Sequence, residues 1–236
     1  MGIAQGQSCK SKNRTPQKGG KIKIMTDRYD TSGSSEGRYQ PGSDDQVLVN
    51  KLGISDHSEM EEVELDLLDQ LTGALLEEVS EDQTITAMNL CEWHRRWLGN
   101  VYEWAGQYRS VNMSKGDFHF AASHLVPKLM QDFNDKYLAI YTPCNGMDEK
   151  QLIDALAKIH IEFILIHPFR EGNGRLSRFL ANMMSLQAGQ PLLDFSYMDE
   201  KKQEYFSAIQ AGLDNYDPMK EMFTQVLRVS QQNAGG

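Results

Sequence analysis

Cysteine is scarce in this sequence. The chain of 236 residues has three, Cys9, Cys91 and Cys144, and none of them stands in CxxC spacing. This pattern argues against a disulfide framework and against a zinc site, and it is typical of proteins in a reducing compartment. The sequence also lacks an apolar run of membrane-spanning length, and residues 1–24 contain no apolar segment like that of a signal peptide. We therefore expect a cytoplasmic protein with no membrane partner.

Positive charge is also scarce over most of the chain. Lys and Arg number 24 against 33 Asp and Glu, which gives a net charge of −9 at pH 7. Residues 1–24 are the exception, because they are basic and contain no acidic residue. The acidic remainder argues against nucleic acid as a partner, since binding to a phosphate backbone needs clustered Lys and Arg. Residues 1–24 predict a disordered basic leader, or an upstream start with Met25 as the true first residue.

Apolar residues make up 40% of the chain, which is enough for a sizeable core. After residue 60 they recur at helical spacing, and this predicts one mainly α-helical domain over residues 59–230. Residues 25–58 predict an irregular N-terminal segment, and residues 231–236 predict a flexible tail. His94 lies beside Trp93 and Trp97, a setting typical of a packed core histidine.

The most informative stretch follows an apolar run that ends at Ile166. Its helical spacing predicts a central buried helix, with Asp148 and Gln151 as the capping pair at its start. Pro168 lacks an N–H and biases the preceding residue away from the helical region, so the helix should stop near His167.

After this break, Gly172 and Gly174 permit backbone shapes that gather N–H groups into a concave nest. A second helix then starts, with its unpaired N–H groups and positive dipole end facing the same spot. The sequence therefore predicts an anion site, for which phosphate is the usual occupant.

The side chains around this turn agree with a phosphate site. Arg175 and Arg178 are three residues apart, so both can grip phosphate oxygens from one helix face. Glu171 could hold a divalent cation that bridges to phosphates. His167 could take a proton from an attacking hydroxyl as a neutral imidazole. Together they predict a site for phosphoryl or nucleotidyl transfer.

This stretch resembles the signature of the Fic-domain family, H-x-F-x-[DE]-G-N-G-R-x-x-R, and matches it at every fixed position. The matching residues are His167, Phe169, Glu171, Gly172, Asn173, Gly174, Arg175 and Arg178. The resemblance extends roughly from Tyr39 to the C-terminus, and residues 39–54 resemble the corresponding segment of many bacterial members. It implies a Fic-type helical bundle, with a central helix pair around the signature loop and a short β-hairpin flap. It also implies a protein adenylyltransferase that moves AMP from ATP to a Ser, Thr or Tyr hydroxyl of a target protein with Mg²⁺.

The resemblance assigns a role to each signature residue. His167 would be the general base for the target hydroxyl, and Glu171 would hold Mg²⁺ on the phosphates. Arg175 would bind phosphate, and Arg178 would hold the terminal phosphate. The backbone that forms the phosphate nest would come from Gly172, Asn173 and Gly174. Phe169 would anchor the loop in the core.

Two stretches before the signature also resemble the family. Residues 102–109 read as its Y-x-[WF]-A-G-x-x-R pattern, and residues 111–121 alternate around a Lys-Gly pair as a short hairpin would. In the family this hairpin is the flap, whose backbone edge pairs with the target segment. The implied docking residues are Lys115, Gly116, Asp117 and Phe118.

Ser32 and Glu36 fit the [ST]-x-x-x-E-[GN] pattern of the family's inhibitory helix. There the glutamate pairs with the second signature arginine, here Arg178, and blocks the terminal phosphate. Self-inhibition by this segment and inhibition by a separate antitoxin both stay open.

Other activities of the family compete with AMP transfer. A kinase like Doc would carry Lys in place of Gly174 and would lack the second arginine, so both positions argue against it. Phosphocholine transfer and removal of AMP stay open, because the signature specifies a pyrophosphate site and not the group that moves. A silent nucleotide-binding module is disfavoured, since His167 and Glu171 are both present.

Overall fold

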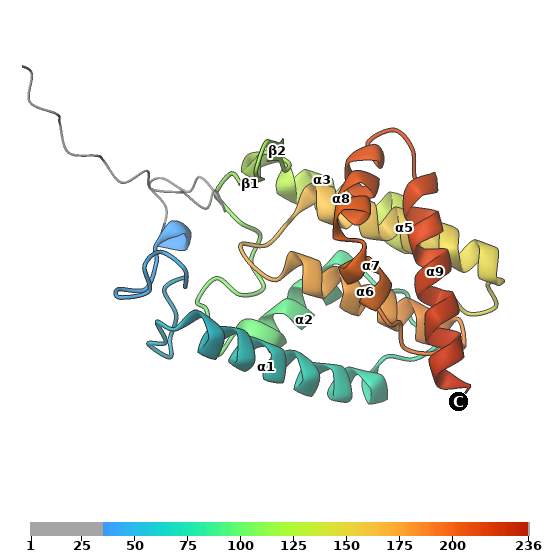
Figure 1. Cartoon of the computed structure of the whole chain (residues 1–236), viewed down its shortest axis with the longest axis horizontal. Helices are drawn as coiled ribbons and strands as arrows, with labels where there is room; N and C mark the ends of the chain where they lie inside the picture. Colours follow the sequence, from blue (N-terminus) through green and yellow to red (C-terminus); the bar gives the residue numbers. More distant parts are fainter. Residues whose placement is uncertain (1–34, 236) are drawn as a thin grey trace, which may run out of the picture.

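The computed structural model describes residues 35–235 of the chain, so the basic leader and Ser32 lie outside the described residues. This part is mainly helical, as predicted (Figure 1). Its α-helices are α1 (His57–Glu78), α2 (Ala87–Leu98), α3 (Val126–Phe133), α4 (Ala139–Tyr141), α5 (Glu149–Ile166), α6 (Asn173–Gln187), α7 (Ser196–Glu200), α8 (Lys202–Ala211) and α9 (Asp217–Ala234). Within residues 35–235, none of the helices has the length and apolar composition that a membrane span requires.

The predicted central helix is α5, which packs against α6 and α9 and also contacts α3 and α8. Buried residues lie all around it, because neighbouring helices cover it on several sides. Its predicted cap is confirmed: the Asp148 side chain accepts a hydrogen bond from the Gln151 N–H, and the Gln151 side chain accepts one from the Asp148 N–H. This cap sets the residue at which α5 begins. The signature stretch follows directly after the other end of the helix.

The end of α5 also agrees with the prediction. The helix stops at Ile166, and His167 takes a left-handed conformation with φ 51° and ψ 61°. Residues other than glycine rarely adopt this conformation, and such strained residues cluster at functional sites. After a short turn α6 begins at Asn173 and packs back against α5. The central helix pair around the signature loop is therefore present.

A short antiparallel hairpin lies near one edge of the molecule, and α1 lies along the opposite edge (Figure 1). Strand β1 (Ser114–Lys115) pairs with β2 (Phe118–His119) in the register Ser114 to His119. The turn contains Gly116 with φ +58°, a conformation that glycine accepts readily. The predicted hairpin is confirmed, and the signature stretch lies between it and α1.

The N-terminal segment of the described chain is irregular but held by backbone hydrogen bonds, and the C-terminal helix is longer than predicted. The N-terminal segment forms a bridge between Tyr39 and Leu48, and Lys51 donates its backbone N–H to the carbonyl of Val101. At the other end α9 extends to Ala234, beyond residue 230 where we expected the domain to end. One reason is that the Gln231 side chain bonds to neighbouring helix ends, which stabilises the last turn.

Candidate active site

A cavity of about 560 Å³ lies where the hairpin, the end of α5, the start of α6, α7 and α8 meet. The signature residues that line it are His167, Glu171, Gly172, Asn173, Gly174, Arg175 and Arg178. The hairpin contributes Lys115, Gly116 and Phe118, whereas Asp117 is exposed at the turn and does not line the cavity. Three of the four predicted docking residues and seven of the eight signature residues therefore line one cavity, and the eighth, Phe169, is fully buried in the core.

His167 is buried at the floor of this cavity, with 9% of its surface exposed. Its Nδ1 lies 3.3 Å from the carbonyl oxygen of Ile164, an acceptor, so Nδ1 carries the proton. Burial, and to a smaller extent the nearby Arg109, lower the pKa of His167 to about 3, so the ring is neutral at pH 7. The ring of Phe120 stacks on the imidazole with the centroids 3.8 Å apart. The ring thus keeps its Nε2 as an acceptor.

Arg109 fixes the position of His167 relative to the hairpin. Its Nε donates to the carbonyl of His167 at 2.6 Å, and its Nη1 and Nη2 donate to the carbonyls of Val111 and Ala121, which flank the hairpin. The guanidinium is buried and satisfies the carbonyl of Ile166 as well. Arg109 therefore joins the flap to the end of α5, a role that the sequence pattern did not reveal.

The turn after His167 is held by Asn173 and shaped by Gly172. The Asn173 side chain accepts from the N–H of Phe169 at 2.8 Å and donates to its carbonyl at 2.7 Å, so this residue contributes only its backbone to the nest. Gly172 has φ +80°, and a Cβ there would lie 2.6 Å from the Trp97 ring. No side chain fits at this position.

Gly174 differs from the prediction. It is an ordinary helical residue of α6, and a Cβ there would meet nothing within 4 Å. Of the two glycines, only Gly172 has an unusual backbone shape. In residues 35–235, the N–H groups of Asn173, Gly174 and Arg175 have no hydrogen-bond acceptor, as expected for a helix start. These residues line the cavity, and a helix start of this kind is able to bind an anion.

His94 is the packed core histidine that the sequence predicts. Its ring stacks on Phe169 with the centroids 4.0 Å apart, and burial lowers its pKa to about 4. Its Nδ1 accepts from the N–H of Gly106 at 2.8 Å, so its Nε2 carries the proton and donates to the carbonyl of Glu171 at 3.1 Å. His94 thereby ties the signature loop to α2 and to residues 102–109.

The two signature arginines are held by carboxylates from different helices. Arg175 Nη2 lies 2.5 Å from an oxygen of Glu64 in α1, whereas Arg178 makes two bonds of 2.6 and 3.1 Å to Asp199 in α7. The predicted pairing of Arg178 with Glu36 is therefore wrong for this structure. The Glu36 carboxylate instead accepts from the N–H and the hydroxyl of Ser110, both at 3.0 Å. Asp199 on α7 occupies the position that we expected Glu36 to take.

Glu171 fits the prediction of a magnesium ligand. Its Oε1 accepts the N–H of Gly172 at 3.0 Å, and the side chain borders the cavity. No cluster of three or more His, Cys, Asp or Glu that could hold a metal occurs among residues 35–235. Mg²⁺ does not need one, because it binds through one or two carboxylates plus waters and substrate phosphates.

The comparisons with known proteins agree with this geometry. The model of the Fic/DOC family matches residues 84–185. The chain is 26% identical over 216 residues to the probable protein adenylyltransferase Fic of Escherichia coli. This match covers 86% of this chain and 96% of the Escherichia coli protein. It is 30% identical to the probable protein adenylyltransferase y4lH of Sinorhizobium fredii, over 69% of this chain and 81% of that one.

Other relatives are longer, and the chain spans 34% of the protein adenylyltransferase Fic of Nematostella vectensis. Among solved structures it is similar to the BepC protein of Bartonella tribocorum, which was crystallised with bound AMPPNP. The TM-score is 0.64 at 22% sequence identity, and the match covers 81% of this chain and 96% of that one.

Proposed function

The chain belongs to the Fic/DOC family, and we propose that it is a protein adenylyltransferase that transfers AMP from ATP to a hydroxyl group of a target protein. The observation that carries the proposal is the meeting of a neutral His167 with the start of α6 in one cavity. The first supplies a base and the second an anion site.

In the proposed reaction, the hydroxyl oxygen of the target attacks the α-phosphorus of ATP. The bond between this phosphorus and the bridging oxygen breaks, and pyrophosphate leaves. His167 Nε2 takes the hydroxyl proton, while its Nδ1–H stays on the carbonyl of Ile164. Bound phosphates would raise the pKa of His167 from about 3, because a nearby negative charge favours the protonated ring.

The rest of the site acts by positioning and by neutralising charge. The N–H groups at the start of α6 and the guanidinium groups of Arg175 and Arg178 face the cavity where the phosphates would lie. Glu171 would hold Mg²⁺, which when bound supplies positive charge against the phosphates.

The hairpin is the proposed docking site for the target. Its two strands are only two residues long and pair with each other, and the outer edge of such a hairpin is where a target segment would add as a third strand. Lys115, Gly116 and Phe118 lie beside the cavity that contains His167, so a paired segment would bring its hydroxyl near the base. We also propose a cytoplasmic location, on the cysteine content.

Labelling with radioactive ATP tests the proposal. The purified chain is incubated with Mg²⁺ and either α-labelled or γ-labelled ATP, alone and with bacterial lysate. We expect label on protein from α-labelled ATP only, and none with the His167→Ala variant. His124→Ala is the matched control, since His124 is exposed and outside the cavity. Label from γ-labelled ATP alone would indicate a kinase, and failure of the chain to bind ATP would contradict the proposal.

Inhibition by a segment of the chain, or by a separate antitoxin, stays a prediction. The Glu36→Gly variant tests the first form. If Glu36 restrains the site, labelling with this variant rises above that of the unaltered chain, and unchanged labelling argues against the role.

A further inference from the structure

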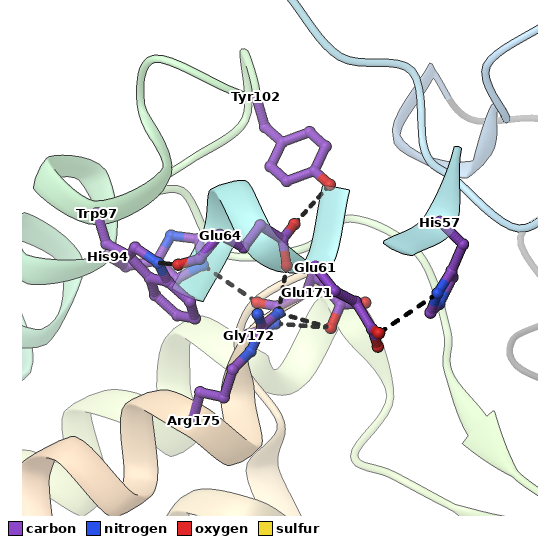
Figure 2. Close-up of polar contacts among 9 residues, drawn as sticks. All are labelled: His57, Glu61, Glu64, His94, Trp97, Tyr102, Glu171, Gly172 and Arg175. Carbon is purple, nitrogen blue, oxygen red and sulfur yellow. Dashed lines mark hydrogen bonds and ion pairs between the residues drawn. The ribbon is translucent and has the colours of Figure 1, made fainter. Parts of the chain in front are cut away.

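A second polar cluster lies on the α1 side of the signature stretch (Figure 2). We call it the Glu64 cluster, and it consists of Glu64, Tyr102, Glu171 and Arg175. Glu171 and Arg175 line the main cavity, and they also line a smaller cavity of about 280 Å³ bordered by α1. The cluster therefore stands between the two cavities.

Glu64 is a buried carboxylate in a fixed position. Only 4% of its surface is exposed, and its Oε1 accepts the hydroxyl of Tyr102 at 2.7 Å. Its backbone carbonyl accepts the indole N–H of Trp97 at 2.8 Å, so both ends of the residue are held from outside α1. A buried carboxylate needs a cationic partner, because its desolvation is otherwise uncompensated. That partner is Arg175.

Arg175 is shared between two carboxylates through one nitrogen. Its Nη2 lies 2.5 Å from Oε2 of Glu64 and 3.6 Å from Oε1 of Glu171. Figure 2 shows the arginine reaching from α6 toward both acids. The guanidinium carbon lies 4.8 Å from the centre of the Trp97 ring, which supports its flat face. In residues 35–235, neither Nε nor Nη1 of Arg175 has a hydrogen-bond acceptor.

Without Glu64, the near carboxylate would take this nitrogen. Arg175 Nη2 is already 3.6 Å from Glu171 Oε1, close enough for the two opposite charges to pair. Such a pair would occupy a carboxylate oxygen and cancel the negative charge that attracts a cation. The Glu64 side chain is 6% exposed and that of Glu171 is 35% exposed, so the pair with Glu64 is less weakened by water.

We propose that Glu64 is a positioning residue that draws Arg175 away from Glu171. Glu171 is thereby kept available for the divalent cation of a nucleotide, and Arg175 keeps its Nε and Nη1 for phosphate oxygens. The inference rests on the proposed function only in taking ATP with Mg²⁺ as the ligand. It does not require that AMP is transferred.

Calorimetric titration of ATP into the Glu64→Gln variant tests this role. Titrations are run over a series of Mg²⁺ concentrations and in EDTA. Glutamine keeps the size of the side chain and can still accept from Tyr102, but it no longer competes as an anion for Arg175. We expect the Mg²⁺ concentration needed for half-maximal enhancement of ATP binding to rise by about tenfold, as for other residues that orient a metal ligand. In EDTA the affinity for ATP should not fall, because the site has lost a negative charge.

Three further variants make the result specific. Tyr102→Phe, which removes one hydrogen bond to Glu64, should raise the Mg²⁺ requirement in the same direction by a smaller factor. Glu61→Gln is the matched control, since Glu61 lies one turn earlier in α1 and pairs with His57, and its Mg²⁺ requirement should be unchanged. In a Glu171→Gln background, Glu64→Gln should add nothing, because the carboxylate that it protects is already absent.

The outcomes separate this role from the others. A folded Glu64→Gln protein with an unchanged Mg²⁺ requirement overturns the inference, and so does an equal loss of affinity in Mg²⁺ and in EDTA. The expected shift without any transfer of AMP would contradict the proposed function and leave the inference standing. If the unaltered chain does not bind ATP, both are overturned.

Discussion

The two signature arginines pair with carboxylates at nearly the same distance but in different surroundings. Arg175 lies 2.5 Å from Glu64, and Arg178 lies 2.6 Å from Asp199. The Glu64 side chain is 6% exposed, whereas that of Asp199 is 62% exposed. The energy of an ion pair depends on its exposure to water as much as on distance. The two contacts therefore have different strengths and different uses.

The supporting structure differs in the same way. Glu64 lies on α1, a helix of 22 residues, and is held by Trp97 and Tyr102, which are almost fully buried. Asp199 lies on α7, which has five residues, and its neighbour Glu200 is exposed. We infer that the contact of Arg175 with Glu64 on α1 is fixed and that the contact of Arg178 with Asp199 on α7 can be exchanged for a ligand.

The largest expected effect comes from removing each arginine in turn. Arg175→Ala leaves the buried Glu64 without its cation and should lower the free energy of unfolding by about 4 kcal/mol. Arg178→Ala leaves an exposed Asp199, which water can solvate, and should cost less than about 1 kcal/mol. Urea denaturation followed by circular dichroism measures both values. Equal losses would show that the two ion pairs are equivalent.

Lowering the pH should lower the free energy of unfolding through the buried His94. Its pKa is about 4 in the folded chain and about 6.5 when unfolded, so between these values the unfolded chain binds the extra proton. Stability is therefore complete above pH 6.5 and falls as the pH approaches 4, by about 3 kcal/mol from this residue.

The pH dependence of urea denaturation checks this sign and size. The His94→Gln variant, although less stable, should show a slope smaller by one proton over this range. His124→Gln should keep the original slope, because His124 is exposed. A slope that His94→Gln does not change would place the acid sensitivity elsewhere, for example at the buried His160 or His167, whose pKa values are about 3.

The features that could be predicted from the sequence are those that depend on residues close together in the chain. The break at His167, the start of α6 and the hairpin depend on neighbours in the chain, so proline, glycine and apolar spacing were enough to predict them. The unusual backbone shape expected at Gly174 is absent, because a glycine in sequence does not reveal its φ. Only the fold shows that Gly172 lies against Trp97 while Gly174 faces open space.

The partners of the arginines depend on distant parts of the chain. Glu64 and Arg175 are 111 residues apart, and no local pattern connects them. One signal was present: Glu64 lies four residues after Met60 and seven before Leu71, on the buried face of an otherwise acidic helix. An acid on an apolar stripe predicts a buried ion pair, but not its partner. The pairing of Glu36 with Arg178 came from a short motif, and the fold placed Asp199 there instead.

Substituting alanine for each of the two glycines of the signature should change stability by smaller amounts and in opposite directions. Gly172→Ala forces φ +80° on a residue with a Cβ and a collision with Trp97, so it should lower stability by about 2 kcal/mol. Gly174→Ala improves helix propensity and should raise stability by up to about 1 kcal/mol. Its methyl group would face the anion site, so ATP binding should weaken. Thermal unfolding and calorimetry measure the two quantities, and a Gly174→Ala protein that binds ATP normally would contradict a close approach of phosphate there.

The smallest effect should come from Asp199→Asn, which removes the exposed partner of Arg178 and keeps the shape of the side chain. Because a terminal phosphate must displace Asp199 to reach Arg178, affinity for ATP should rise, by up to about fivefold for an exposed ion pair. Stability should change by less than about 0.5 kcal/mol, since surface substitutions rarely do more. Glu200→Gln is the control, because this neighbour is exposed and does not line the cavity. Calorimetry that finds ATP affinity unchanged or weaker would show that Asp199 does not compete with the ligand, and the contrast between the two arginines would then be one of stability alone.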